Sequence, residues 1–165
     1  MTYTEAVDWL YAAVPNFQRD GGNKNYKIGL EGPEALWNYL DRPSDAIPTI
    51  HIAGTNGKGS SAHLISAGLQ SMGCKVGVFS SPHLFNFRER AKIGTKMVPE
   101  SFVAQWVSQH RGEVEQKGNS FFELTLMLAM SWFEEEKVDW IILETGMGGR
   151  LDATTICTPE ICLIT

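Results

Sequence analysis

The sequence predicts an α/β fold in which a doubly wound, mostly parallel sheet is flanked by helices. Short unbroken apolar runs, such as 140–143 and 161–164, are typical of strands buried inside a parallel sheet. Longer segments with apolar residues three or four positions apart alternate with these runs. Glycine-rich turns at 54–59 and 146–149 follow two of the runs, where a strand would end.

The N-terminal part of the chain predicts two helices. Thr4 can cap a first helix that runs to about Val14, and a proline follows it. Residues 19–25 are a loop by composition. A second helix is predicted over 33–40, because Pro33 suits the first helical position and an apolar stripe follows.

Strands and helices alternate after this point. Strands are predicted over 49–53 and 75–79, and a short one over 90–93. The helix between the first two, over 60–72, ends at Gly73. Its apolar face is expected to contain Ala62, Ile65, Leu69 and Met72.

Two further helices precede the last strands. Pro99 opens the first, whose apolar face contains Phe102, Val103, Trp106, Val107, His110 and Val114. The second, over 121–136, is apolar nearly all round and should be buried on several sides. Strands over 140–143 and 161–164 complete the pattern.

Composition restricts the protein's class. The chain has 165 residues, 43% of them hydrophobic, which suits one domain with a core. A net charge of −5 argues against a general nucleic-acid surface, which needs a basic face. The three cysteines, Cys74, Cys157 and Cys162, form no CxxC pair, which argues against a disulfide framework or zinc site.

The N-terminal residues contain no basic region followed by an apolar core, so no signal peptide is predicted. The most apolar stretch, 124–133, is shorter than the ~20 residues that a membrane-spanning helix needs. We therefore expect a cytoplasmic protein without a membrane partner.

The most informative motif is a candidate phosphate-binding loop after the first predicted strand. It consists of Gly54, Thr55, Asn56, Gly57, Lys58, Gly59 and Ser60. Glycines let backbone N–H groups face an anion, lysine adds a positive charge, and a hydroxyl can bind magnesium. The generic pattern is matched imperfectly, since Ile52 stands where it has glycine and the hydroxyl comes one place late. The alternative is a strand-to-helix turn that binds nothing.

Glu144 is the second candidate site residue. It ends a predicted apolar strand and precedes a glycine turn, where a carboxylate is costly unless it is paired. Magnesium is a natural partner, because it takes oxygen ligands and bridges to phosphate. A structural ion pair is the alternative. Ligands of such sheets bind at the carboxyl ends of the strands, where Gly54, Ser81 and Glu144 all fall.

Three segments together resemble a known family. They are 54–60, the Ser-Ser-Pro-His-Leu run at 80–84 with Glu89-Arg90, and 144–154. In this order they resemble folylpolyglutamate synthases and dihydrofolate synthases, which are Mur-type ligases. The resemblance implies a P-loop NTPase-like fold of the Mur ligase central-domain type.

The resemblance also implies an activity. The family uses ATP and Mg²⁺ to convert a substrate carboxylate into an acyl phosphate, which the amino group of L-glutamate then attacks. The substrates would be dihydropteroate or folates, and we expect a monomer. Residues 1–165 would form a single, incomplete ATP-binding domain, with the family's glutamate-binding domain absent.

The resemblance assigns roles to individual residues. Lys58 and Glu144 would be catalytic, with Lys58 on the β- and γ-phosphates, while Ser81 and Glu144 would be metal ligands. Phe122 and Asp152 would contact the pterin ring by stacking and by pairing. Alternative roles are a core position for Phe122 and a turn cap for Asp152 or Ser81.

Other residues are less informative. His51 and His83 are interpreted as structural, and Glu123 as hydrogen-bonded near the site. Arg90 and Arg150 could face an anionic substrate tail, although surface arginines are common. Two functional alternatives stay open: a nucleotide- or folate-binding fragment without ligase activity, and a different Mur-type amino-acid ligase.

Overall fold

The computed structural model describes residues 1–12 and 29–165, so the predicted helix end near Val14 and the loop over 19–25 lie outside the described residues. A six-stranded sheet has the order β4-β3-β2-β5-β1-β6. Its strands are β1 (Thr49–Ala53), β2 (Val76–Phe79), β3 (Ala91–Ile93), β4 (Lys96–Met97), β5 (Trp140–Glu144) and β6 (Ile161–Ile164). β2, β5, β1 and β6 are parallel, which confirms the predicted α/β fold.

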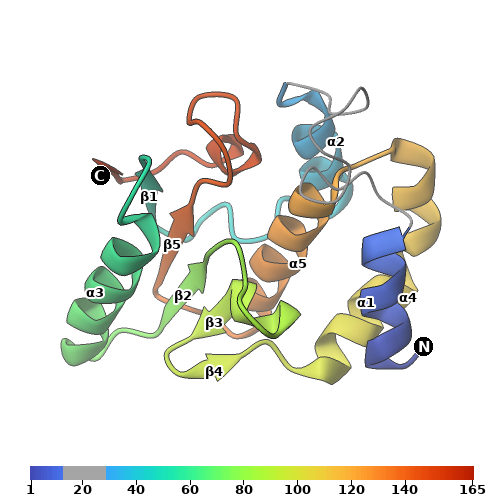
Figure 1. Cartoon of the computed structure of the whole chain (residues 1–165), viewed down its shortest axis with the longest axis horizontal. Helices are drawn as coiled ribbons and strands as arrows, with labels where there is room; N and C mark the ends of the chain where they lie inside the picture. Colours follow the sequence, from blue (N-terminus) through green and yellow to red (C-terminus); the bar gives the residue numbers. More distant parts are fainter. Residues whose placement is uncertain (13–28) are drawn as a thin grey trace.

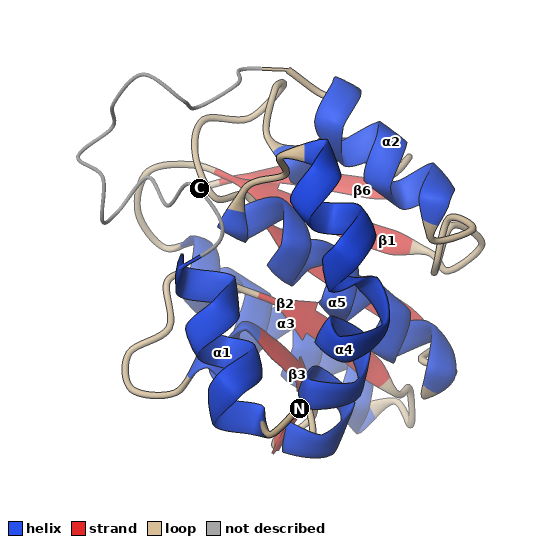
Figure 2. Ribbon diagram, turned by 90° about the vertical axis from the view of Figure 1, so that its right-hand side faces the viewer, coloured by secondary structure: helices blue, strands red, loops and turns tan. Residues whose placement is uncertain are grey.

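Helices cover both faces of the sheet. They are α1 (Tyr3–Ala12), α2 (Glu31–Tyr39), α3 (Lys58–Ser71), α4 (Glu100–Lys117) and α5 (Phe121–Glu135), with short 3₁₀ helices η1 (Phe87–Arg90) and η2 (Ala153–Ile156). Figure 1 shows α3 on one side of the sheet and α5 on the other. Figure 2 shows α1, α2 and α4 on the α5 side, where they form an outer layer.

The alternation of side chains along the strands divides the core in two. Ile142 faces α3 and packs with Ile50 and Ile52, whereas Ile141 and Leu143 join the larger cluster around α5. The predicted burial of α5 on several sides is confirmed, since ten of its residues are buried. Gly77 lets α5 approach closely, because a Cβ there would lie 2.7 Å from the Phe133 ring.

Three helix predictions were wrong in detail. α1 begins at Tyr3 and is capped by Thr2, whose hydroxyl accepts a hydrogen bond from the Glu5 N–H while Glu5 accepts one from the Thr2 N–H. α2 begins two residues before Pro33. α3 begins at Lys58 and not at Ser60.

The remaining differences lie at the edges. Met72, expected on the apolar face of α3, is 78% exposed because the helix has already ended at Ser71. β3 and β4 form an antiparallel hairpin beside β2, and the two-residue β4 was too short to predict. No helix in residues 1–12 and 29–165 combines the length and apolar character needed to cross a bilayer.

Candidate nucleotide and substrate site

The predicted phosphate-binding loop joins β1 to the first turn of α3. Gly57 has a φ of 85°, a left-handed conformation that favours glycine, and it directly precedes Lys58. Within the described part of the chain, no side chain caps this helix end. The backbone N–H groups of the first turn are therefore available to an anionic ligand, and the helix dipole favours negative charge there.

Position 54 requires glycine both because of its backbone conformation and because a side chain there would have no room. Its φ is 143°, and a Cβ there would lie 2.3 Å from the carbonyl oxygen of Thr165, beyond the end of β6. Lys58 folds back over the same loop, and its Nζ donates a hydrogen bond to the Gly54 carbonyl at 3.0 Å. An ammonium group therefore lies inside the loop, where phosphate oxygens would replace the carbonyl as acceptors.

Glu144 brings three segments together at the carboxyl edge of the sheet. It ends β5, is 5% exposed, and its Oε2 accepts a hydrogen bond from the Ser81 N–H at 3.2 Å. A Cβ on Gly59 would lie only 3.6 Å from the same oxygen, so the carboxylate faces the start of α3. The structure thus assembles the loop, Ser81 and Glu144, as their positions after three parallel strands predict.

The carboxylate of Glu144 has few partners for a buried anion. Burial raises its pKa above the ordinary glutamate value, and the Ser81 N–H and the charge of Lys58 lower the pKa in part. No ion pair of Glu144 occurs among the described residues. A divalent cation would supply the missing compensation.

These donors fit magnesium better than zinc. Among residues 1–12 and 29–165, no group of three or more His, Cys, Asp or Glu side chains could hold a metal. Mg²⁺ does not need such a cage, because it is commonly held by one or two carboxylates, water and the substrate phosphates. Glu144 beside the predicted phosphate-binding loop, with Ser81 next to it, fits that combination.

Asp152 is even more buried than Glu144, at 3% exposure, and it is the N-cap of η2. Its Oδ2 accepts hydrogen bonds from the Gly146 and Met147 N–H groups, both at 2.9 Å. Its Oδ1 accepts from the Thr154 N–H and hydroxyl, at 3.0 and 2.6 Å. The turn-capping alternative therefore describes its bonding, and contact with a pterin ring stays a prediction.

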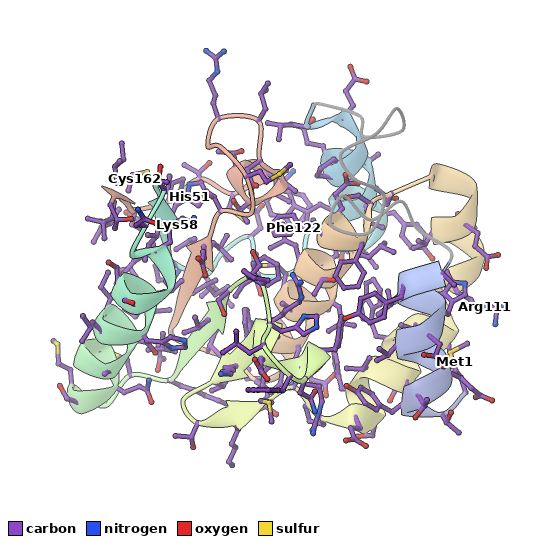
Figure 3. All side chains as sticks on the ribbon, viewed as in Figure 1. Met1, His51, Lys58, Arg111, Phe122 and Cys162 are labelled. Atoms are coloured by element: carbon purple, nitrogen blue, oxygen red, sulfur yellow. The ribbon has the colours of Figure 1, made fainter. Side chains whose placement is uncertain are left out.

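Phe122 lies on the other side of the same glycine turn. Its ring packs edge-on against Phe79 with a centroid distance of 5.4 Å, and a Cβ on Gly146 would lie 2.7 Å from it. In Figure 3, Phe122 extends from the start of α5 and Lys58 from the start of α3, on opposite faces of the sheet. Phe122 is partly buried and packs against the larger core cluster, so the core alternative describes its packing, and stacking on a pterin ring stays a prediction.

Sequence reasoning underestimated the burial of Arg90, and its contact with an anionic substrate tail stays a prediction. Arg90 is 4% exposed and not on the surface, and its Nε donates to His83 Nδ1 at 2.8 Å. The other ring nitrogen of His83 lies 3.0 Å from the Tyr11 hydroxyl. Because Nδ1 accepts from Arg90, the neutral His83 ring carries its proton on Nε2. Burial lowers the pKa of Arg90, and burial followed by the Arg90 charge lowers that of His83.

Other expectations can be checked directly. Glu123 is hydrogen-bonded as expected, since its carboxylate accepts from Asn119 and Ser120 at 2.8 and 2.9 Å. His51 is a satisfied strand histidine, as interpreted, with Nε2 lying 2.7 Å from the Thr154 hydroxyl. Thr154 itself was missed, because nothing in the sequence pairs it with a residue 103 positions away. Ser60 is exposed in the first turn of α3, and the role of its hydroxyl in binding phosphate or magnesium stays a prediction.

Comparisons with known proteins agree with the earlier resemblance. The chain is 33% identical over 170 residues to a probable bifunctional folylpolyglutamate synthase/dihydropteroate synthase from Haloferax volcanii, covering all of this chain and 19% of that protein. It is 32% identical to the dihydrofolate synthase/folylpolyglutamate synthase of Bacillus subtilis, covering 99% of this chain and 38% of that protein. It is 38% identical to the human mitochondrial folylpolyglutamate synthase, covering 98% of this chain and 30% of that protein.

Solved structures show the same similarity. A folylpolyglutamate synthase from Thermotoga maritima superposes with a TM-score of 0.83 at 37% identity, covering 95% of this chain and 36% of that one. A bifunctional folylpolyglutamate synthase/dihydrofolate synthase with Mn, AMPPNP and L-glutamate bound gives 0.85 at 30% identity, covering 99% and 38%. The chain belongs to the folylpolyglutamate synthase and dihydrofolate synthase family.

The match covers nearly all of this chain but only part of each relative. The chain spans between 19% and 38% of the length of the three relatives described above. No family model matches the chain. A further family structure, a complex with AMPPCP and folate, has a TM-score of 0.87 at 29% identity, and the match covers 99% of this chain and 40% of that one.

Proposed function

We propose that this chain is the nucleotide-binding part of an ATP-dependent ligase that adds L-glutamate to dihydropteroate or to folates through an acyl phosphate. The convergence of Lys58, Ser81 and Glu144 at one edge of the sheet supports this most strongly. Family membership supports the substrate class, since relatives in solved structures bind ATP analogues, folate and L-glutamate. Three free cysteines are consistent with a cytoplasmic location.

In this proposal the phosphate-binding loop holds ATP. The free N–H groups at the start of α3 bind phosphate oxygens, and Lys58 exchanges the Gly54 carbonyl for the β- and γ-phosphates. Its charge stabilises the phosphate oxygens as the terminal phosphoryl group leaves for the substrate carboxylate. Bound Mg²⁺ would neutralise phosphate charge, and Glu144 with Ser81 would hold it at the loop.

The glycine turn after β5 would form the substrate side. Phe122 offers a partly exposed ring on which a flat heterocycle can stack. Asp152 holds the backbone of this turn, and a direct contact with the ring's amino-pyrimidine edge is part of the proposal. The carboxylate of the substrate must then point toward Lys58, where the phosphoryl group arrives.

Calorimetric titration tests the nucleotide half of the proposal. The chain is titrated with MgAMPPCP as wild type, as Lys58→Ala and as the control Lys75→Ala. Lys75 is a matched control, since it is a half-exposed lysine paired with Glu136 at 2.6 Å. We expect Lys58→Ala to weaken binding about 10- to 100-fold, the loss of a charge-assisted contact, and Lys75→Ala to leave it unchanged.

The same chain is then titrated with dihydropteroate and assayed with ATP, dihydropteroate and L-glutamate. Binding of both ligands without glutamate-dependent turnover would favour the alternative of a binding fragment. Unchanged nucleotide affinity in Lys58→Ala, with the fold retained by circular dichroism, would contradict the proposed phosphate site. Preference for a UDP-linked peptide precursor over dihydropteroate would favour a different Mur-type ligase.

A further inference from the structure

A continuous chain of hydrogen bonds links the strand before the phosphate-binding loop to the glycine turn on the substrate side. It begins at His51 in β1, three residues before Gly54, and passes through Thr154 to Asp152. Asp152 continues it to the N–H groups of Gly146 and Met147. His51, Thr154 and Asp152 are all at most 8% exposed, so the chain is shielded from solvent.

The direction of each bond in this chain is determined by its donors. The Thr154 hydroxyl has one proton, and it donates this proton to Asp152 Oδ1 at 2.6 Å. His51 Nε2, at 2.7 Å from the same hydroxyl, must then be the donor in that contact. His51 therefore carries a proton on Nε2, and burial, which lowers its pKa, favours the neutral form of the ring.

The far end of the chain determines where an aromatic ring can lie. Asp152 fixes the backbone of Gly146 through a hydrogen bond from the Gly146 N–H. The Phe122 ring packs directly on Gly146, since a Cβ on Gly146 would lie 2.7 Å from the ring. A rotation of the Asp152 carboxylate would release the Gly146 and Met147 N–H groups together. The Thr154 hydroxyl opposes that rotation because it donates to the other carboxylate oxygen, and the His51 ring in turn holds this hydroxyl.

We infer that His51 and Thr154 are positioning residues for the aromatic ligand site beside Phe122, acting through Asp152 on the Gly146–Met147 backbone. Neither residue touches Phe122 in any contact given by the structure, and neither belongs to the phosphate-binding loop. The inference rests on the proposed function for the identity of the ligand. The holding of the turn itself depends only on the hydrogen bonds described above.

Substitutions at Thr154 and His51, the two members of the chain before Asp152, test this inference. Thr154→Val removes the hydroxyl and keeps the shape, and Thr154→Ser restores it. Thr49→Val is the matched control: Thr49 is 2% exposed and in the same strand as His51, but its hydroxyl donates to the Ile47 carbonyl. His51→Leu tests the other end of the chain in case Thr154→Val impairs folding, which the thermal midpoint of each variant reports.

Two readouts separate positioning from general destabilisation. The first is hydrogen exchange of the Gly146 and Met147 amides, measured by NMR. The second is the Kd of pteroate compared with that of MgAMPPCP. In Thr154→Val and His51→Leu we expect both amides to exchange about tenfold faster and pteroate to bind about tenfold more weakly, with MgAMPPCP changed less than about twofold. Thr154→Ser and Thr49→Val should resemble wild type.

Unchanged amide exchange in Thr154→Val and His51→Leu would overturn the inference, as would equal acceleration in Thr49→Val. It would also be overturned if wild type binds pteroate and Thr154→Val does so with the same Kd. A failure of the proposed function looks different, because the wild-type chain would bind no pteroate at all. In that case accelerated exchange would still support the holding of the turn, and unchanged exchange would exclude it.

Discussion

Glu144 and Asp152 stand at the two ends of one glycine-rich loop, and their surroundings differ sharply. Both carboxylates are buried, at 5% and 3% exposure. Asp152 accepts four hydrogen bonds from the described residues, and Glu144 accepts one, at 3.2 Å. Similar burial therefore accompanies very different degrees of compensation for the negative charge.

The difference indicates what each carboxylate does. A buried anion that accepts four hydrogen bonds from its own chain stabilises the backbone that surrounds it. A buried anion with one long hydrogen bond is an unfavourable arrangement that a bound cation relieves, and such arrangements cluster at functional sites. On this basis Asp152 stabilises the loop, and Glu144 is the better candidate for a metal ligand.

The largest effect on stability is expected at Asp152. Asp152→Asn places an amide NH₂ opposite backbone N–H donors, so at least one buried donor loses its acceptor. We expect the free energy of unfolding to fall by about 2–3 kcal/mol, measured by urea denaturation. Asp45→Asn is the control, since Asp45 is 46% exposed in a surface pair with Arg42. Equal losses in the two variants would contradict the distinction between the carboxylates.

The next effect concerns the ring that rests on the loop. Gly146→Ala places a Cβ against Phe122, and the overlap should lower the unfolding free energy by about 1–2 kcal/mol. Pteroate affinity, measured by fluorescence titration, should fall about tenfold as Phe122 is displaced. Gly149→Ala is a close control, because no atom lies within 4 Å of a Cβ there. If Gly149→Ala weakened binding as much, loop flexibility and not the position of Phe122 would be responsible.

A smaller effect of opposite sign is expected at Glu144. Glu144→Gln removes a poorly compensated charge and keeps an oxygen for the Ser81 N–H. The ligand-free chain should gain about 1 kcal/mol, a rise of roughly 2–4 °C in Tm. Mg²⁺-dependent nucleotide affinity should fall at the same time. A loss of stability in Glu144→Gln, with exposed Glu113→Gln unchanged, would show that Glu144 is already satisfied.

The smallest expected effect is the pH dependence of the stability gained in Glu144→Gln. Burial raises the Glu144 pKa in the folded state, so the folded chain keeps this proton to a higher pH than the unfolded chain, whose carboxyl titrates near pH 4.5. Stability from this group is present below that pH and is lost as pH rises through the folded pKa. The stability difference between Glu144→Gln and wild type should therefore widen with pH and then become constant. A difference independent of pH from 4 to 8 would exclude a raised pKa.

Local patterns predicted most of the fold and the nucleotide side of the site. Strand β5, helix α5 and the loop from Gly54 to Ser60 each carry their signal within a few neighbouring residues. The carboxyl ends of parallel strands then bring Glu144 and Ser81 to that loop without further information. Edge elements such as β4 carry too short a signal, which explains why they were missed.

The state of each carboxylate could not be predicted in the same way. Asp152 and Glu144 are both acids next to a glycine turn, and only contacts through space separate them. His51 reaches Thr154 across 103 positions, and Arg90 is buried by aromatic rings that include Phe121, with its guanidinium 5.0 Å from that ring. Such contacts depend on packing between distant segments, and a single sequence has no local pattern for them.

The contact between Gly54 and Thr165 has a consequence for the order in which the protein becomes functional. The Thr165 N–H donates to the Ala53 carbonyl at 3.0 Å, and Thr165, which directly follows β6, lies against Gly54, the first glycine of the predicted phosphate-binding loop. The ribosome therefore synthesises the loop more than a hundred residues before it can make the segment that seals it. A nascent chain released before β6 pairs with β1 would carry the complete nucleotide motif in an unfinished shape. Loop closure over such a distance is slow compared with helix formation, so this loop should reach its final shape only after α3 has formed.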